Sequence, residues 1–399
     1  MTGRELAALL SAEAPRHGVR EAAVGLLCDG ATTAACYGDG VTADTRFLVG
    51  SLTKPMVATV LARFASAGRL SLDDPASVHV PELRGCDWAE RSTLRDLLAN
   101  RSGLPLSAAL EFGFESRREE DDGALARFAA EVAAATPTPG IWSYSNAGWS
   151  LLGRAVETAA DATWEEAMHA ELATTLPDAT FASADGLPGR AYAPAGTRVA
   201  STIADLLRFA ALHLDDRSLA VLREVHAETA IHGWLDAWCL GWARFDWPGG
   251  PVWGWDGVIG GARTVLRLVP EQRGAVAFAA NDGAGRALYR AVLPHVMADA
   301  FGITQPPLRL EPTLGAGDLS RFAGVYAWPD EQVVVTATED GLVITSADGE
   351  QHARPLDGRT VVVDAADPDT PTISFGAFDA AGRPHVLYVM IWGFPRVGT

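Results

Sequence analysis

Apolar residues recur along this chain with two different spacings, and these spacings separate predicted helices from predicted strands. Residues 4–18 have the spacing of an amphipathic helix, which Pro15 and Gly18 should end. Short apolar stretches bounded by turn residues follow, and they predict strands at 21–30, 32–40 and 45–51. The chain therefore begins with one helix and a set of strands.

A second helix is predicted from Ser51 to Gly68. Its apolar positions repeat at helical spacing, and Pro55 falls in or just after the first turn, where a missing N–H costs least. The region that follows, roughly 70–240, is rich in alanine and has a mostly helical pattern. We expect it to form a helical subdomain.

Strand patterns return after this region, at 262–270 and 274–283, and a helical pattern follows at about 285–300. Strands on both sides of a helical region predict an α/β (α+β) fold, in which one sheet is flanked by helices and interrupted by a helical insertion at about 70–240. Because 399 residues are too many for one compact core, we expect two domains and assign the larger one to residues 1–303.

The remainder of the chain has a different composition. Residues 304–314 are rich in proline and leucine with few strand formers, and they are predicted to be a linker. Residues 315–399 contain short alternating strand patterns separated by Asp-Gly and Gly-Arg turns. This pattern predicts a small all-β domain, either an antiparallel lipocalin-like barrel or a sandwich.

The net charge of the chain disfavours several classes of binding partner. A formal charge of −18 disfavours nucleic acid and anionic membrane surfaces, since both would be repelled, and it disfavours an anionic substrate as well. The N-terminal apolar run is short and contains a glutamate, so no signal peptide is predicted, and no apolar run reaches membrane-spanning length. We expect a cytoplasmic protein, and the sequence carries no signal for its oligomeric state.

One lysine stands out as candidate chemistry. Of the 32 lysine and arginine residues, all except Lys54 are arginine, and Lys54 lies three residues after Ser51. That spacing places both side chains on the same side of a helix start. A buried lysine can lose its proton and activate a serine hydroxyl, which arginine cannot do, and free N–H groups at a helix N-terminus can stabilise an oxyanion. The Ser-x-x-Lys pattern alone is weak, because it also occurs by chance.

A second group is the Tyr-Ser-Asn sequence at 144–146. Tyr144 can share a proton with a nearby lysine, and Asn146 can hydrogen-bond both the lysine and a substrate carbonyl. The alternative is purely structural: a core tyrosine that caps a helix, with the asparagine in the turn.

A third group is the sequence Trp255-Asp256-Gly257-Val258. Gly257 would let a substrate approach the strand, so that the N–H of Val258 faces that of Ser51 and completes an oxyanion hole. The structural alternative is an edge strand with a glycine bulge.

The three groups, in this order, resemble the motifs of the serine β-lactamase and penicillin-binding-protein family, in particular its class C-like branch. The resemblance covers about residues 10–303 and includes recurrent segments at 68–83, 94–105 and 201–209. It implies the antiparallel sheet with a helical subdomain that the pattern also predicts. It further implies that Ser51 is the acylated nucleophile and that Lys54 and Tyr144 transfer its proton, with no metal or organic cofactor.

The third motif departs from the family's pattern. Trp255 stands where β-lactamases and carboxypeptidases keep Lys or His, and an indole cannot bind the carboxylate of a β-lactam. Asp256 would repel a carboxylate if it faced the cleft. The Trp-x-Gly form resembles the family's carboxylesterases and acyltransferases, and neutral Lys54 coupled to Tyr144 becomes the favoured base.

Six tryptophans lie within 22 residues around this motif, and we expect most of them in the core and the rest in the wall of an apolar acyl pocket. His232 is interpreted as structural or solvated. The resulting hypothesis is a serine acyl-transfer enzyme that takes an acyl group from a small ester or activated amide and passes it to an amine, an alcohol or water. The alternatives are a D-amino-acid peptidase, an amidase or a β-lactamase and, in another class, a non-catalytic binding or sensor module.

Overall fold

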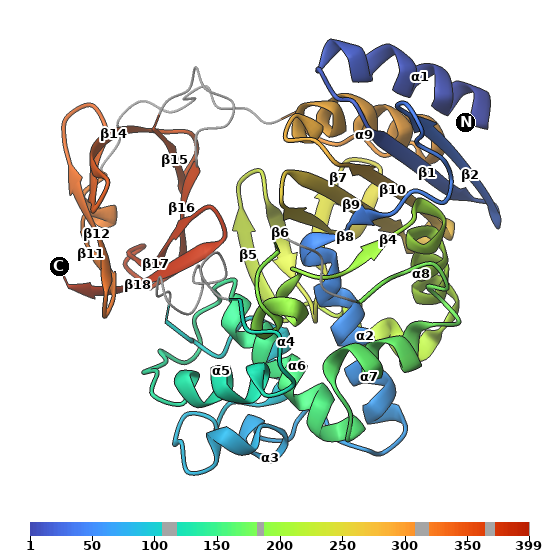
Figure 1. Ribbon diagram of the computed structural model, residues 1–399. Coiled ribbons are helices and arrows are strands. Elements are labelled where there is room, and N and C mark those ends of the chain that lie inside the picture. The colour runs from blue at the N-terminus through green and yellow to red at the C-terminus, as the bar shows by residue number, and fades with distance from the viewer. Residues whose placement is uncertain (106–117, 182–186, 308–318, 364–371, 399) are drawn as a thin grey trace.

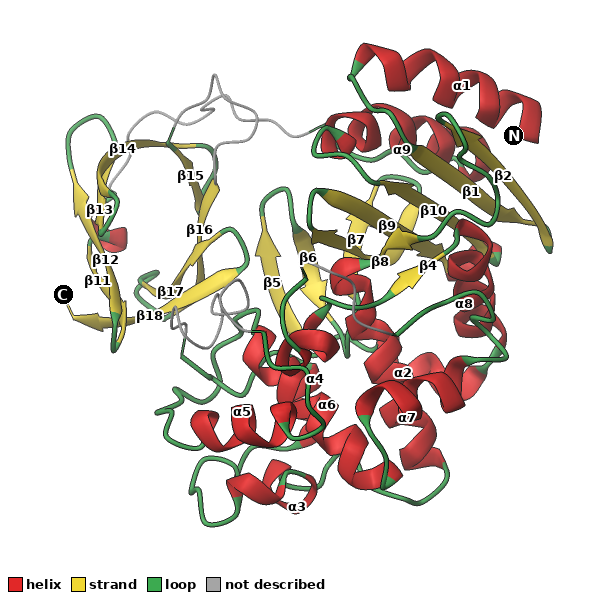
Figure 2. Ribbon diagram, viewed as in Figure 1, coloured by secondary structure: helices red, strands yellow, loops and turns green. Residues whose placement is uncertain are grey.

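The computed structural model shows two β units side by side, one of them surrounded by helices (Figure 1). Figure 2 separates the helical and strand-forming parts of the chain. The residues that the structure describes are 1–105, 118–181, 187–307, 319–363 and 372–398.

The larger unit is built on an eight-stranded sheet in which all neighbouring strands are antiparallel. Its strands, in spatial order, are β2 (Ala31–Tyr37), β1 (Ala22–Cys28), β10 (Gly274–Ala280), β9 (Ala262–Val269), β8 (Gly250–Ile259), β7 (Ala243–Trp247), β6 (Leu235–Trp238) and β5 (Ala227–Ile231). Strand β1, from the start of this unit, thus pairs with β10 from its end. The helical region between them in the sequence is an insertion into one sheet, as the sequence pattern predicts.

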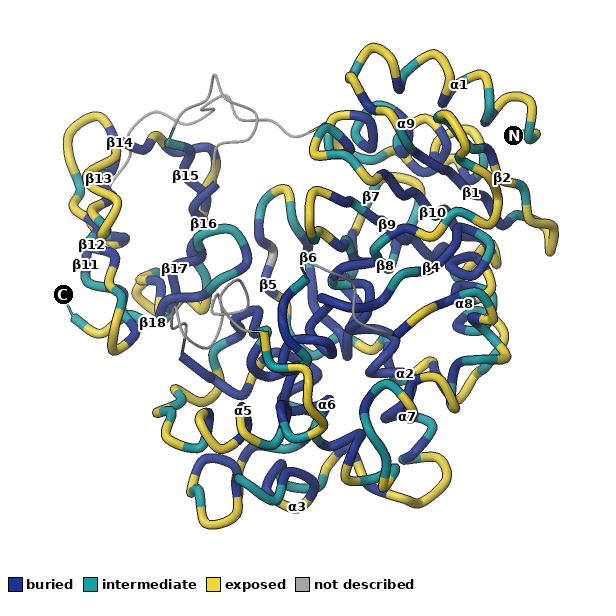
Figure 3. The backbone as a smooth tube through the Cα atoms, viewed as in Figure 1, coloured by how far each residue is buried: buried dark blue, intermediate teal, exposed yellow. Residues whose placement is uncertain are grey.

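Helices cover both faces of this sheet. Helices α1 (Gly3–Arg16) and α9 (Gly285–Phe301) pack on one face, and α8 (Ile203–Asp215) packs on the other. The central strands β1 and β10 are therefore buried along almost their whole length (Figure 3). Their sequences are nearly continuous apolar runs because neither face meets water.

The helical region lies between β2 and β5. Besides α8, its described helices are α2 (Thr53–Ser66), α3 (Ala76–His79), α4 (Leu94–Leu98), α5 (Ala124–Val132), α6 (Asn146–Ala160) and α7 (Trp164–Leu172). Shorter elements connect them, namely β3 (Phe47–Leu48), η1 (Gly50–Leu52), η2 (Pro81–Leu83), η5 (Arg190–Ala195), β4 (Ala200–Ser201) and η6 (Arg217–Arg223). Among the described residues, every helix is too short or too polar to span a lipid bilayer.

Two local expectations differ from the structure. The strand expected at 45–51 is reduced to the two residues of β3, and the α-helix expected from Ser51 begins at Thr53, after one 3₁₀ turn. The helical insertion is also shorter than 70–240, because β5 and β6 belong to the sheet. These two strands are short and their register shifts between Glu228 and Ile231, so they carry little alternation that a sequence reading can detect.

The smaller unit is a closed barrel of eight antiparallel strands in sequence order, which decides between barrel and sandwich. The strands are β11 (Gly324–Trp328), β12 (Glu331–Ala337), β13 (Leu342–Ser346), β14 (Gly349–Pro355), β15 (Thr360–Val362), β16 (Thr372–Phe378), β17 (Pro384–Val389) and β18 (Trp392–Gly398). Closure removes exposed strand edges, and apolar side chains including Phe322, Tyr326 and Phe375 fill the interior. Of the predicted linker 304–314, residues 308–314 lie outside the described part, and the domain boundaries stay predictions.

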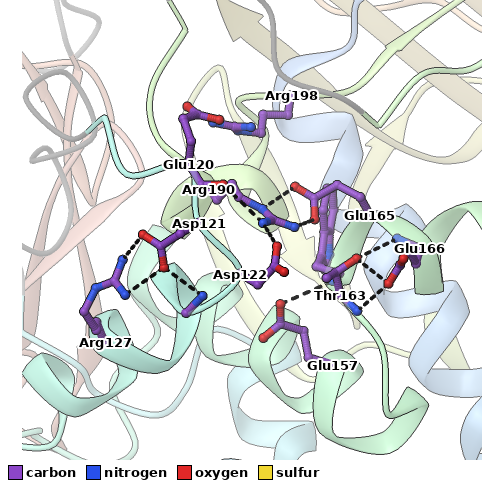
Figure 4. A network of polar contacts seen from close by, with 12 residues as sticks. Glu120, Asp121, Asp122, Arg127, Glu157, Thr163, Glu165, Glu166, Arg190 and Arg198 are labelled. Carbon is purple, nitrogen blue, oxygen red and sulfur yellow. Dashed lines mark hydrogen bonds and ion pairs between the residues drawn. The ribbon is translucent and has the colours of Figure 1, made fainter.

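Charged side chains tie the helical region together (Figure 4). Arg190 of η5 binds Glu165 of α7, at 2.6 and 2.9 Å, and also Asp122. Arg198 binds Glu120 next to this group. Together these bonds fasten η5 to α7 and to the segment that precedes α5.

Glu157 of α6 is a buried acid at the edge of this network. Its carboxylate accepts the backbone N–H of Trp164 and a bond from Arg154, each at 3.3 Å. Burial raises the pKa of Glu157 from 4.5 to about 7, and the nearby Arg154 only partly offsets this rise. The folded protein therefore holds this proton more tightly than the unfolded chain does.

The pKa shift predicts how stability depends on pH. The contribution of Glu157 is fully present below pH 4.5 and is lost as pH rises through about 7, because the folded state must then bury a carboxylate. Glu157→Gln keeps the acceptor but cannot ionise. Its free energy of unfolding, measured by urea denaturation, should improve relative to the wild type by on the order of 2 kcal/mol between pH 5 and pH 8. An equal pH dependence in both proteins would contradict this assignment.

Candidate active site

Ser51 and Lys54 lie where the 3₁₀ turn η1 runs into helix α2. Lys54 is fully buried, Ser51 is partly exposed, and their Nζ and Oγ atoms are 3.2 Å apart. Almost every residue of α2 is buried, so the core surrounds the helix on all sides, and only Arg63, Ala65 and Ser66 near its end are partly or fully exposed. The two side chains therefore lie on the same side of the helix start, one turn apart, as the spacing predicts.

Two further oxygen atoms fix the lysine amine. Lys54 Nζ donates to Asn146 Oδ1 at 3.0 Å and to the backbone carbonyl of Ala195 at the end of η5. These two acceptors occupy two of its N–H groups, and the third direction points to Ser51 Oγ. In that direction the amine can present either an N–H or, when it is neutral, its lone pair. The geometry suits transfer of the serine proton in both directions.

Tyr144 lies over this amine, just before α6. It is almost fully buried, and Lys54 Nζ is 4.8 Å from the centre of its ring. The α6 N-cap is Ser145, whose Oγ accepts the N–H of Gly148 at 3.0 Å. The capping role that the structural alternative assigned to Tyr144 thus belongs to Ser145, which places Tyr144 and Asn146 on the site side of the helix start.

Strand β8 passes directly beside η1 and carries the third motif. A Cβ on Gly257 would overlap the carbonyl oxygen of Val49, and one on Gly50 would lie 2.6 Å from the backbone nitrogen of Val258. Gly50 also has a positive φ of 54°, which glycine adopts most easily. The close approach brings the backbone of Ser51 next to that of Val258, as an oxyanion hole made of these two N–H groups requires.

Trp255 makes a polar contact inside the site. Its indole Nε1 donates to the hydroxyl oxygen of Tyr144 at 3.3 Å, and the two rings are 5.5 Å apart. Its neighbour Trp238 packs edge-on against both rings. The sequence assigned Trp255 to substrate binding, whereas the structure also connects it to Tyr144.

Asp256, which the sequence predicts to repel a substrate carboxylate, is paired with two arginines in the structure. Its carboxylate lines the cavity, but it binds Arg263 at 2.6 Å and Arg267 at 2.7 Å on the neighbouring strand β9. Burial alone would raise the pKa of Asp256, and the two guanidinium groups hold it below its usual value. Two cations offset one anion, so the repulsion of carboxylates expected from Asp256 does not apply.

A cavity of about 1100 Å³ opens above Ser51. Ser51, Tyr144 and Asn146 line it, together with Trp255, Asp256 and Val258 of β8. Of the six clustered tryptophans, Trp238 and Trp242 are fully buried, Trp253 is half-buried, and the three that line the cavity are Trp234, Trp247 and Trp255. Three of the six tryptophans therefore line the cavity, and that they bind an acyl group stays a prediction.

The barrel also contributes to this cavity, which sequence reasoning missed. Its residues Arg359, Met390, Ile391 and Trp392 are among those that line it. His232, interpreted as structural, lines it too, and its carbonyl oxygen accepts a bond from Thr372 of the barrel at 3.2 Å. No local motif marks these residues, because the contact joins segments far apart in the sequence.

Comparisons with known proteins agree with the geometry. A family model described as Beta-lactamase matches residues 6–296. Penicillin-binding protein 4 of Amycolatopsis lactamdurans is 30% identical over 336 residues, which are 72% of this chain and 86% of that protein. Two solved structures are also similar to this chain. SurE with D-Leu has a TM-score of 0.81 at 25% identity and covers 99% of both chains. A class C beta lactamase from Rhodobacter sphaeroides has a TM-score of 0.60 at 20% identity and covers 73% of this chain and 99% of its own.

The family model spans well over half of the chain, and the class C structure has the same fold in the larger unit. The family resemblance inferred from the three motifs is thereby confirmed. This chain belongs to the beta-lactamase family of serine enzymes, with a class C-like fold and an additional C-terminal barrel.

Proposed function

We propose that this enzyme is a serine transacylase, which takes an acyl group from an ester or activated amide onto Ser51 and passes it to an amine. The observation that carries the proposal is the contact of Ser51 Oγ with a fully buried lysine amine whose other bonds are fixed, beneath a cavity of about 1100 Å³. Such a site can hold an acyl group and a second organic molecule at the same time.

In the acylation step, Ser51 Oγ attacks the carbonyl carbon of the donor while Lys54 accepts the hydroxyl proton. The N–H groups of Ser51 and Val258 stabilise the oxyanion. The proton then passes through the Lys54–Tyr144 pair to the leaving group as its bond to the carbonyl carbon breaks. Deacylation reverses these roles: an amine attacks, gives its proton to the same pair, and Ser51 leaves with a proton restored.

Trp255 supports the proton-transfer role of Tyr144. Its indole N–H donates to the hydroxyl oxygen at 3.3 Å and so stabilises negative charge there as the phenol gives up its proton. In the related lactamases a cation stands in this motif. Here a neutral donor takes the corresponding position, so the site is better suited to acyl groups without an adjacent carboxylate.

Two observations favour an amine over water as the acceptor. Trp234, Trp247 and Trp255 of the larger unit and Trp392 of the barrel are among the residues that line the cavity, and we expect these apolar side chains to limit the access of water to an acyl group on Ser51. The second observation comes from SurE, which resembles this chain over 99% of its length and was solved with D-Leu, an amino acid that carries an amine. Hydrolysis by water, which would make the enzyme an esterase or amidase, is the competing outcome.

The first test concerns the nucleophile and its base. Ser51→Ala should abolish acyl-enzyme formation, and Lys54→Arg should reduce it to a few per cent, because a guanidinium cannot act as a base near neutral pH. Intact-mass spectrometry after incubation with an aryl ester measures both effects. Ser66→Ala, at the exposed end of the same helix, is the matched control and should react like the wild type. Normal turnover by folded Ser51→Ala would disprove the assignment.

The second test isolates the indole N–H. Trp255→Phe keeps an aromatic ring but removes the donor to Tyr144, and a hydrogen bond to a charged group contributes about 1.5–3 kcal/mol. The acylation rate measured by stopped flow should fall roughly 10- to 100-fold. Trp253→Phe on the same strand removes an N–H that donates to Arg223 instead, and its rate should change little. Equal rates in both variants would leave Trp255 without a role at Tyr144.

The third test separates transacylase from hydrolase. With an activated ester and rising concentrations of amines, including D- and L-amino acids, the amide fraction of the product should rise at the expense of free acid. Chromatographic quantification of amide and acid gives the ratio directly. A free-acid fraction that stays constant across the whole amine panel would identify a hydrolase.

A further inference from the structure

The barrel reaches the catalytic unit through the turn between β17 and β18 together with the first two residues of β18. Residues 390–393, here called the 390–393 turn, lie against the segment 142–144 that leads into α6. In Figure 1 the β17–β18 hairpin lies on the side of the barrel that faces β5 and the helical region. This segment ends in Tyr144, so the turn contacts the backbone of a proposed proton-transfer residue.

Two hydrogen bonds join the turn to this segment. The backbone N–H of Tyr144 donates to the carbonyl of Ile391 at 3.1 Å. In the opposite direction, the backbone N–H of Gly393 donates to Ser143 Oγ at 3.0 Å, in a buried position. Ser143 and Tyr144 are thus bonded to Gly393 and Ile391 of the turn. Two bonds at adjacent residues restrict both the position and the rotation of the Tyr144 backbone.

Apolar packing reinforces these bonds. Val386, Tyr388 and Ile391 belong to the hydrophobic core of the larger unit and not to the cluster that fills the barrel. The rings of Tyr388 and Trp142 are 5.9 Å apart. Trp142 in turn lies 6.0 Å from Trp238, which packs edge-on against Tyr144. A continuous aromatic path therefore connects the barrel surface to Tyr144.

The turn itself has an unusual backbone. Met390 adopts a φ of +57°, which non-glycine residues seldom do, and its N–H donates to Thr372 of β16 at 3.4 Å. A positive φ is what a two-residue hairpin between the paired residues Val389 and Trp392 requires at this position, so the tight turn itself fixes the backbone of Met390. Met390 and Ile391 also line the cavity above Ser51.

We infer that the 390–393 turn is a positioning element of the active site, which holds Tyr144 in the place where it can exchange a proton with Lys54. The barrel then acts on the chemical step and not only on the access of substrate. This inference rests on the proposed function, because it assigns the turn a role through Tyr144. The residues of the turn are positioning residues, since they act through the tyrosine backbone.

Gly393→Ala tests the inference directly. The added Cβ would lie 2.7 Å from the carbonyl oxygen of Trp142 and 2.9 Å from the Tyr388 ring, so the turn has to move away from segment 142–144. The matched control is Gly398→Ala on the same strand, whose Cβ would meet its nearest atom, on Val325, at an ordinary 3.7 Å. Acylation of Ser51 by an aryl ester is followed in single turnovers from pH 5 to pH 10.

In Gly393→Ala the acylation rate constant should fall at least tenfold, with less than a threefold change in KM and with a displaced pH profile, because proton exchange in the proposed mechanism depends on the position of Tyr144 relative to Lys54. Gly398→Ala should stay within twofold of the wild type in all three quantities. An unchanged rate constant, or a change in KM alone, would show that the turn is only a wall of the cavity and would overturn the inference.

Ser143→Ala is the second variant, which removes the acceptor of the Gly393 N–H without adding bulk. It decides the question if Gly393→Ala does not fold, and it should show the same loss of rate and the same displaced pH profile. The wild-type protein distinguishes a failure of the proposed function from a failure of the inference about the turn. If it forms no acyl-enzyme, the proposed function fails. If it does and both folded variants acylate normally, only the role of the turn is wrong.

Discussion

A buried amine with three oxygen neighbours organises this molecule. An amino group that is removed from water is stable only if its N–H groups find acceptors, and Lys54 finds them in Ser51, Asn146 and Ala195. The three acceptors come from η1, α6 and η5, which are far apart in the sequence. The fold must therefore bring η1, α6 and η5 together around Lys54. The packing of the helical region holds these three segments in place.

Each of these segments has its own support. Ser145, as the N-cap, sets the start of α6. Gly257 lets β8 approach the backbone of Val49 and so sets the distance between β8 and η1. Further away, Arg190 holds η5 through the ion pairs drawn in Figure 4. Each of these contacts fixes a partner of Lys54 or Ser51. Stability and chemistry in this enzyme thus depend on the same contacts.

What the sequence could predict follows from the range of the interactions. Ser51 and Lys54 are one turn apart, so local spacing was enough to pair them. The sheet, the helical region and the all-β nature of the C-terminal unit also followed from periodicity, because each element carries its pattern within itself, whereas the choice between barrel and sandwich needed the structure. Strands β5 and β6 were missed because they are short and irregular within an alanine-rich region.

The errors at the site concern partners that are distant in sequence or on neighbouring strands. Asp256 was expected to repel carboxylates because its neighbours Arg263 and Arg267 face it only after β8 and β9 pair. The contact of Ile391 with Tyr144 spans almost 250 positions, and no motif records it. Residue types reveal candidate chemistry, but charge balance and wall composition depend on long-range packing.

The tryptophan in the third motif is compatible with catalysis for an electrostatic reason. In the proposed mechanism Lys54 becomes positively charged in a buried site when Ser51 gives up its proton, and a second cation beside it would oppose that step. Trp255 donates a hydrogen bond to Tyr144 without adding charge. The nearby arginines 263 and 267 are paired with Asp256, which leaves only part of their positive charge uncompensated. Exchanging a cation for an indole therefore gives up affinity for carboxylates while it preserves, and even favours, proton acceptance by Lys54.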